Sequence, residues 1–337
     1  MNATDNFTGL TVPYQTVALI SSYFILVTIV GVLLNLLTIF ALALGSNISK
    51  EVRIQLINLA AADLAMAALF PSTMMSDSIL FLPFRGSLSW CAVSFFVSAS
   101  AAHASLLCNA AISLERVVIV YFPFKATGYT KTKKYLVVVL IWTCAAVPQI
   151  STARHSVLIN RPDNTTLCEI GIVRTLTYYQ WLEALQSIIP TAIIVTSYTL
   201  VLVKLCVRKK SKLVLKHSSS ADSNTIVKLQ VMLSVDAFLS LVTLLPHDLY
   251  YAARQSSGLD LSTYSVDVLT TDVVLAALTC TNAFSTPVVY LIFNKYFRMD
   301  VKKLFRKICC YNTATKSSQS LEKPEQMNSS ELETRST

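Results

Sequence analysis

The sequence predicts an all-α membrane protein, a seven-transmembrane helix bundle with a short amphipathic eighth helix on the inner leaflet. Apolar residues make up 53% of the 337 residues and charged residues only 14%, and the mean hydropathy is +0.55. An ordinary soluble domain carries about 25% charged residues. Seven apolar runs exceed the length of a buried core helix. Because lipid offers the backbone no hydrogen-bond partners and no alternating barrel pattern is present, these runs must be helices.

The apolar runs give the approximate bounds of the helices. We expect helices at about 17–44, 52–80, 91–123, 134–152, 177–207, 225–253 and 265–293. At about 1.5 Å per residue, the third run exceeds the ~30 Å hydrocarbon core, so that helix must tilt or protrude and can touch most of its neighbours. Prolines within later helices are tolerated in membrane bundles, where they introduce kinks. The segment 153–176 is expected to be a loop.

The distribution of basic residues predicts the orientation. Five of the 28 Lys and Arg residues, all Arg, lie on the side of the amino terminus, and the other 23 lie on the opposite side. The positive-inside rule therefore places the amino terminus outside and the carboxyl terminus inside. This sorting by loop also argues against nucleic acid as the partner of a chain with a net charge of +9.

Three glycosylation sequons fall on the predicted outer side. They begin at Asn2, Asn6 and Asn164, and we expect these residues to be glycosylated. The sequons at Asn47 and Asn328 fall inside and should remain unmodified. Residues 1–16 form a short polar extracellular tail, without the basic residues and apolar run of a signal peptide.

The transmembrane domain, 17–293, is followed by two further segments. Residues 294–308 alternate apolar and basic residues, the pattern of a helix that lies on the inner leaflet of the lipid bilayer. Cys309 and Cys310 follow directly and form a candidate palmitoylation site, which extends the segment to 294–310. Residues 311–337 are polar and rich in Ser and Thr, so we expect a disordered cytoplasmic tail.

Each of the seven helices also carries one marked residue or motif. In chain order they are Asn35; Asn58-Leu59-Ala60-Ala61-Ala62-Asp63-Leu64; Cys91 with Glu115-Arg116; Trp142; Pro190 with Tyr198; Pro246; and Thr286-Pro287-Val288-Val289-Tyr290 followed by Phe297. This ordered set resembles the rhodopsin-like, or class A, G-protein-coupled receptor family over about residues 21–310. The resemblance implies a plasma-membrane receptor that binds an extracellular ligand and activates a heterotrimeric G protein, and it implies no enzyme activity.

The chain departs from the family pattern at its inner half. Glu115-Arg116-Val117 replaces Asp-Arg-Tyr, and Thr286 replaces the Asn of Asn-Pro-x-x-Tyr. In the sixth expected helix, at about 225–253, Leu244 and Ser240 replace the usual Trp and Phe of the family. Ile226 occupies the region where an acid is common. These departures leave open an alternative, an atypical ligand-binding or scavenging receptor without G-protein coupling. A transporter would require repeat symmetry and a broken midplane helix, and the sequence has neither feature.

The resemblance implies an activation switch at the inner mouth of the bundle. In that interpretation Glu115 holds Arg116 at rest, and an outward swing of helix 6 frees Arg116 for hydrogen bonding with Tyr198 and Tyr290. A G-protein segment would then fill the opened cleft, and arrestin could bind the Ser/Thr-rich tail. The full switch set is Glu115, Arg116, Tyr198, Pro246, Pro287 and Tyr290. The alternative is that Glu115 and Arg116 form a purely structural interfacial pair.

One acid near the bilayer midplane is a candidate cation ligand. Asp63, Ser105 and Asn282 match the positions of the family's sodium pocket, so an allosteric sodium ion is the only cofactor expected. The alternative is a protonated or hydrogen-bonded structural Asp63. Asp236 is a second acid of the inner half without a counterpart in the family pattern, and we expect it to face Asn109 or water.

Polar residues in the outer half of the bundle predict a ligand pocket. Helical rise places them roughly 10 Å or more below the outer rim; they are Ser98, Glu183, Gln186, His247, Asp248, Tyr251 and Asp272. The alternative is that Glu183, His247 and Asp248 satisfy one another without a ligand. Ser98 replaces the Asp of amine receptors and Cys280 the retinal Lys of opsins. A peptide, a polar metabolite or a chemosensory cue is therefore favoured as the ligand.

The cysteines separate into two groups by predicted location. Cys108, Cys144, Cys206 and Cys280 lie within apolar spans, so we expect small buried side chains. Cys91 and Cys168 fall at the oxidising outer face, where a disulfide forms readily. We expect a Cys91–Cys168 disulfide to pin the second outer loop over the pocket.

Overall fold

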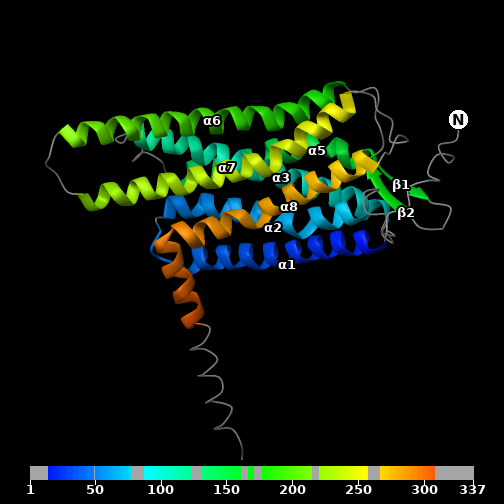
Figure 1. The fold of residues 1–337 in the computed structure, drawn as a ribbon, viewed down its shortest axis with the longest axis horizontal. Coiled ribbons are helices and arrows are strands. Elements are labelled where there is room, and N and C mark those ends of the chain that lie inside the picture. The colour runs from blue at the N-terminus through cyan, green and yellow to red at the C-terminus, as the bar shows by residue number, and fades with distance from the viewer. Residues whose placement is uncertain are drawn as a thin grey trace, which may run out of the picture.

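The computed structural model describes residues 14–48, 50–76, 87–122, 131–160, 166–170, 177–214, 220–256 and 266–307. Seven long helices in these ranges run side by side as a bundle, with a β-hairpin at one end (Figure 1). The helices are α1 (Tyr14–Leu44), α2 (Lys50–Ser76), α3 (Leu88–Tyr121), α5 (Lys131–Arg154), α6 (Thr177–Val214), α7 (Ser220–Ser256) and α8 (Val266–Phe293). Each is long and apolar enough to cross a membrane, which confirms the predicted fold class.

The hairpin lies in the segment for which the sequence predicted a loop, so that prediction was wrong. Strands β1 (Ser156–Asn160) and β2 (Thr166–Ile170) pair antiparallel, with Leu158 opposite Cys168. Each strand carries β-branched and aliphatic residues, which favour extended structure. Leu158 packs against Cys91 and Phe95 of α3. The hairpin is therefore held onto the end of α3.

Helices α6 and α7 extend further than the apolar runs indicated. The apolar part of α6 ends near Val207, but the helix continues to Val214 through a basic stretch. Similarly, α7 begins at Ser220, in a polar sequence. A hydropathy pattern marks only the membrane-embedded part of a helix, because its polar continuation in water carries no apolar signal.

The outward faces of the bundle are apolar, as lipid contact requires. On α1 alone, the exposed side chains include Leu19, Ile25, Leu26, Ile29 and Leu33. A soluble monomer rarely exposes a continuous apolar surface of this kind.

Two of the four cysteines within the spans are not buried, contrary to expectation. Cys108 and Cys280 lie inside the bundle, whereas Cys144 and Cys206 are exposed. The sequence could not separate the two pairs, because a membrane-spanning helix is apolar both on the face toward lipid and on the face toward the bundle.

Helix α3 lies at the centre, as predicted. It contacts α2, α5, α6 and α7, and also both strands. Its first turn is capped by Ser87, whose hydroxyl accepts a hydrogen bond from the Trp90 amide at 3.2 Å.

Hydrogen bonds between marked residues tie neighbouring helices together. Asn58 of α2 donates to Cys108 Sγ of α3 at 2.9 Å and accepts from Trp142 Nε1 of α5 at 2.8 Å. On α1, Asn35 donates to the carbonyls of Gly31 and Ala283, which joins α1 to α8. A Cβ at Gly31 would lie 2.8 Å from the Ala67 Cβ, so glycine permits the close approach of α1 and α2.

Residues 295–307 form the predicted amphipathic helix, which turns away from the bundle after Asn294 (Figure 1). The Asn294 side chain caps it by accepting from the Phe297 amide at 3.1 Å. Asp300, only 2% exposed, accepts hydrogen bonds from the Ser46 amide at 3.2 Å and from Asn47 Nδ2 at 2.6 Å. This clamp joins the helix to the turn after α1.

Candidate functional site

The inner mouth of the bundle differs from the predicted resting arrangement. Glu115 accepts its ion pair from Lys134 Nζ of α5, and the Lys134 side chain is only 1% exposed. No ion pair joins Glu115 to Arg116 in the part of the chain that the structure describes. The expectation that Glu115 holds Arg116 was therefore wrong, because a cation from another helix takes the carboxylate.

Arg116 lies buried in the same region, with most of its hydrogen-bonding capacity unused. Its side chain is 3% exposed, and Nε and Nη2 have no hydrogen-bond partner among the described residues. The guanidinium acts electrostatically on the hydroxyls of Tyr198 and Tyr290, both buried, from α6 and α8. Tyr290 also packs edge-on against Phe297, with ring centroids 6.0 Å apart. Three helices thus bring Arg116, Tyr198 and Tyr290, three of the six predicted switch residues, into one region.

The candidate sodium ligands are only partly assembled in the core. Ser105 donates to Asp63 Oδ1 at 2.7 Å, and Asp63 is fully buried. The Asn282 side-chain oxygen instead accepts from Thr243 at 3.2 Å. Asp63 and Ser105 therefore form the centre of this site, and Asn282 lies in an adjoining hydrogen-bond network.

This adjoining network lies on α7, at the level where Ser240 replaces the Phe of the family pattern. Asn109 donates to Ser240 at 3.2 Å, which joins α3 to α7, and the expected contact between Asn109 and Asp236 is not observed. The Thr279 hydroxyl donates to the Thr243 carbonyl at 3.1 Å and so joins α8 to α7. Hydrogen bonds replace aromatic packing at this level of the bundle.

Two residues of the outer polar group, His247 and Asp248, lie next to each other on α7 and contact α6. Asp248 accepts a hydrogen bond from Ser187 of α6 at 2.6 Å, and His247 Nδ1 lies 3.6 Å from the other carboxylate oxygen. The Phe70 ring packs edge-on against His247 at a centroid distance of 5.8 Å. The side chains of His247 and Asp248 remain 21% and 27% exposed.

The other predicted ligand residues are dispersed. Gln186 donates to the Cys144 carbonyl at 2.8 Å and accepts from Gln149 at 3.0 Å. Ser98 is buried and donates to the Ser94 carbonyl of its own helix. Asp272 is buried on α8. The side chains of Glu183 and Tyr251 lie outside the described residues.

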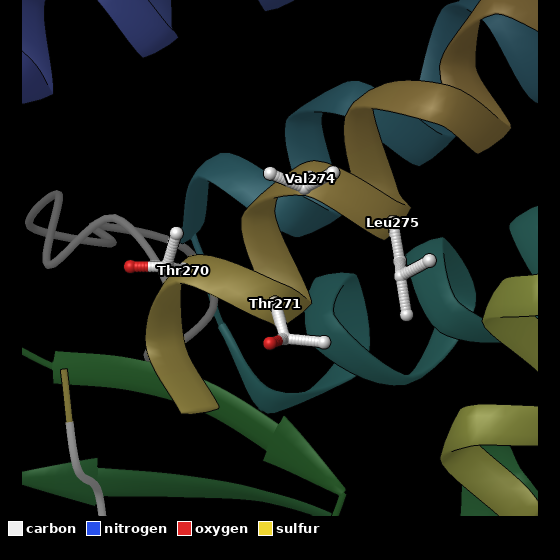
Figure 2. A pocket seen from close by; sticks show the side chains of 4 residues that line it. All are labelled: Thr270, Thr271, Val274 and Leu275. Carbon is white, nitrogen blue, oxygen red and sulfur yellow. The ribbon is translucent and has the colours of Figure 1, made fainter. Parts of the chain in front are cut away.

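A hollow in the surface lies elsewhere, on the first turns of α8. Figure 2 shows that it is lined by Thr270, Thr271, Val274 and Leu275, with the β-hairpin nearby. None of the predicted ligand residues lines it. Since Asp248, His247 and Ser187 carry the polar groups that could orient a ligand, we place the candidate ligand site at these residues.

Comparison with known proteins decides the family. Residues 34–290 match the model of the 7 transmembrane receptor (rhodopsin family). The chain belongs to this family. Members of this family are receptors rather than enzymes.

Curated members of the receptor family match most of the chain at low identity. The growth hormone secretagogue receptor type 1 of Sus scrofa is 26% identical, with 82% of this chain and 77% of the relative covered. The rhodopsin of Petromyzon marinus is 22% identical, covering 87% and 81%. The somatostatin receptor type 2 of Sus scrofa is 23% identical, covering 91% and 82%.

In this receptor, Cys91 is disulfide-bonded, as predicted. Its Sγ lies 3.9 Å from the Val157 carbonyl of β1, and Cys168 lies on β2 opposite Leu158. The Cys168 side chain is outside the described residues, so the pairing itself stays a prediction. So do the modifications at Asn2, Asn6, Asn164, Cys309 and Cys310, which are also outside them.

Sequence reasoning missed two polar partners in this receptor. Lys134 had been grouped with the basic residues that set the orientation, and Ser187 had no assigned role. A basic residue inside a predicted span, near the level of Glu115, was the available signal for Lys134. Ser187 carried no such signal, because serine is common within membrane helices.

Proposed function

We propose that this chain is a plasma-membrane receptor that binds an extracellular ligand and promotes nucleotide exchange on a heterotrimeric G protein. Its amino terminus would face outside and its carboxyl terminus inside. The arrangement of Arg116 carries this proposal: a buried guanidinium with unused donors lies beside two tyrosine hydroxyls at the inner mouth. Backbone carbonyls of a partner segment would accept from such donors.

The mechanism requires one element with two states, and α7 fits that role. Its outer half carries His247 and Asp248, its centre hydrogen-bonds to α3 and α8, and its inner half lies near Tyr290. A ligand that repositions the outer half would shift the inner half, because Pro246 lies between them. Ligand and G protein then bias the same equilibrium, so each raises the affinity of the other.

For the ligand, we propose a molecule with a cationic or multiply hydrogen-bonding group, such as a basic peptide or a polar metabolite. Two relatives are by name receptors for somatostatin and for growth hormone secretagogues. Asp248 already accepts from Ser187 and faces His247, so an incoming cation would have to displace the imidazole. Glu183 and Tyr251 would supply further contacts.

Two further partners complete the proposed receptor. Asp63 with Ser105 would bind an allosteric cation, with sodium as the occupant that the family resemblance implies. The Ser/Thr-rich tail would bind arrestin after phosphorylation, and palmitate on Cys309 and Cys310 would anchor the amphipathic helix.

Nucleotide exchange in purified membranes tests the function directly. The wild type, Arg116→Ala and Arg306→Ala are each combined with candidate G proteins, and bound nucleotide is followed over time. Exchange by the wild type and by Arg306→Ala, an exposed arginine of the amphipathic helix, but not by Arg116→Ala, supports the proposal. A well-expressed wild type that binds ligand but drives no exchange supports the scavenging alternative, which Leu244 and Ser240 favour.

A further inference from the structure

A hollow of about 340 Å³ lies on the side of the bundle where α3 and α5 pack together, near the end that carries the β-hairpin. On each helix, the lining residues are spaced one, three or four positions apart, so they share one helix face. They are Ala92, Val93 and Phe96 of α3 and Ile150, Ala153 and Arg154 of α5. The hollow is therefore a site between two helices and not a gap along one of them.

The lining of the hollow is apolar except at one residue. Ala92 and Ala153, one from each helix, carry only a methyl group and so leave room between the helices. Val93 and Ile150 are 52% and 45% exposed, so the hollow opens away from the bundle and toward lipid. An apolar surface gains dispersion contacts only when another apolar group fills the space beside it. A hydrocarbon chain is therefore the part of a ligand that fits here.

The one charged residue of the lining lies at the level of the lipid head groups. The apolar span of α5 ends at Ser151, and the exposed Arg154 lies three residues further, roughly 5 Å along the helix axis. On α3, Trp90 is 51% exposed two residues before Ala92, and tryptophan is typical of the membrane–water interface. The hollow thus runs from the hydrocarbon region to a cation at the interface.

The charge of Arg154 is available to a ligand. The ion pairs in the described part of the chain are Lys134–Glu115 and His247–Asp248, and Arg154 belongs to neither. A cation in the last turn of a helix is favoured by the terminal carbonyls. This explains why an arginine is tolerated at the end of α5, but it leaves the guanidinium without an anion. A guanidinium binds a carboxylate or a phosphate through two parallel hydrogen bonds.

We propose that this hollow binds an acidic amphiphile, a molecule with one hydrocarbon chain and an anionic head group. The chain would lie against Ala92, Phe96 and Ala153, and a carboxylate or phosphate would accept hydrogen bonds from Arg154. A neutral amphiphile with the same chain would leave the guanidinium unmatched. The site is separate from the ligand site proposed at Asp248 of α7 and does not depend on G-protein coupling.

An amphiphile in this hollow would contact the central helix of the bundle. Cys91 and Phe95, the neighbours of Ala92 and Phe96 on α3, are buried and pack with Leu158 of the hairpin. Because a ligand that binds only the folded arrangement stabilises it, occupancy would favour the packing of α3 on α5 and of the hairpin on α3.

Photolabelling of the full chain in phosphatidylcholine nanodiscs tests the site without a G protein, so its failure is distinguishable from failure of the receptor function. The probe is oleate with a diazirine in its chain, and labelled peptides are mapped by mass spectrometry. We expect labels within 92–96 and 150–154. Excess oleate or oleoyl lysophosphatidate should displace the probe, and the stronger competitor identifies the preferred head group. Monooleoylglycerol, which has the same chain and no charge, should not displace it.

Matched variants separate the charge from the shape of the hollow. Arg154→Gln should lower the labelling about tenfold, because hydrogen bonds to a charged group are lost, whereas Arg154→Lys should retain most of it. Ala153→Phe should abolish the labelling, because the ring fills the hollow. Leu19→Phe, on the exposed face of α1, and Arg306→Gln, on the amphipathic helix, should label as the wild type does. Thermal unfolding without the probe verifies that each variant is folded.

Three results would overturn the proposal. Labels spread evenly over the outward faces of the bundle, and not displaced by oleate, would show annular lipid contact only. Unchanged labelling of a folded Arg154→Gln would show that no acid is recognised there. If the variants fail to fold, the wild type decides, because displacement by monooleoylglycerol as readily as by oleate would exclude a role for the charge.

Discussion

Glu115 pairs with Lys134 of α5 and not with Arg116, its neighbour in the sequence. The carboxylate that should restrain Arg116 is therefore occupied in the described arrangement. Arg116 keeps free donors at the inner mouth, and no acid of the described chain holds it in an ion pair. In the proposed mechanism this lowers the cost of reaching the coupling state, so we expect measurable nucleotide exchange without ligand.

Removal of the Lys134 charge should both destabilise the protein and reduce its basal activity. Lys134→Met takes the cation away from Glu115, whose side chain is 11% exposed; breaking a buried ion pair typically costs about 3 to 5 kcal/mol, less whatever a new pair with Arg116 restores. Glu115 then becomes available to Arg116, so basal exchange should fall. Thermal unfolding and nucleotide exchange measure the two effects.

The double variant Lys134→Met with Glu115→Gln is the control for this pair. It removes both charges, so most of the lost stability should return. If Lys134→Met alone is as stable as the wild type, the ion pair does not stabilise the fold. Another interaction must then control the position of Arg116.

The Asp300 clamp should hold the amphipathic helix against the bundle. Asp300→Ala removes two hydrogen bonds to a carboxylate, from the Ser46 amide and from Asn47. Hydrogen bonds to charged groups contribute about 1.5 to 3 kcal/mol each, so the helix should detach more often. Faster trypsin cleavage at Lys295 and Arg298 would report this. Lys302→Ala, at an exposed neighbouring position, should leave the cleavage at Arg298 unchanged.

The same clamp gives a test of orientation. We predict glycans at Asn2, Asn6 and Asn164 but none at Asn47, whose side-chain nitrogen donates to Asp300 at 2.6 Å. Glycopeptide mass spectrometry of protein from a eukaryotic host measures all four sites. A glycan at Asn47 would require the turn after α1 to have faced the lumen, which would reverse the proposed topology.

The fold could be predicted from the sequence, because each helix carries a long apolar run. The family pattern also singled out Asn58 and Trp142, although it did not predict the hydrogen bond between them. The hairpin could not be predicted, because its strands become stable only when packed against α3 at Leu158 and Cys91. Short strands depend on such tertiary contacts more than on intrinsic preference.

The polar partnerships were less predictable than the positions of the residues. Arg116 lies within electrostatic range of Tyr198 and Tyr290 without a hydrogen bond to either in the described chain, and the partner of Glu115 comes from a helix sixteen residues or more away in the chain. Thr286 likewise comes near Asp63 only through the packing of α8 on α2. Residue spacing along one helix shows which side chains share a face of that helix. Which side chain of another helix they meet depends on how the two helices are rotated about their axes when they pack, and the sequence does not show this.

Cys91 and Cys168 should act as one unit. If they form the predicted disulfide, Cys91→Ser, Cys168→Ser and the double variant should lose surface expression or ligand binding to the same extent, since each change breaks the same bond. A structural disulfide contributes roughly 2 to 4 kcal/mol. Cys144→Ser, a change of a free thiol, is the control. Additive losses in the double variant, or a free Cys168 thiol in peptide mapping, would show that Cys91 has another partner.

The ligand site is tested by separating recognition from structural support at Asp248. If Asp248 and Glu183 bind a cationic group, Asp248→Asn and Glu183→Gln should each weaken ligand affinity by about 2 to 5 kcal/mol, as truncation of a buried charge pair does. Tyr251→Phe should matter less, since it removes one hydroxyl and no charge. Competition binding with any ligand found by screening peptide, lipid and metabolite libraries measures these differences.

Ser187→Ala then distinguishes the two roles of the carboxylate. It removes the donor that holds Asp248 at 2.6 Å but leaves the charge in place. If Asp248 recognises the ligand, Ser187→Ala should reduce affinity only modestly, far less than Asp248→Asn does. Asp248 instead serves the packing of α6 against α7 if two results are obtained together. Asp248→Asn and Glu183→Gln bind ligand within about threefold of the wild type, a difference below ~1 kcal/mol. Ser187→Ala and Asp248→Asn also lower the unfolding temperature equally. The ligand site must then be sought toward the Thr271 and Leu275 hollow of α8.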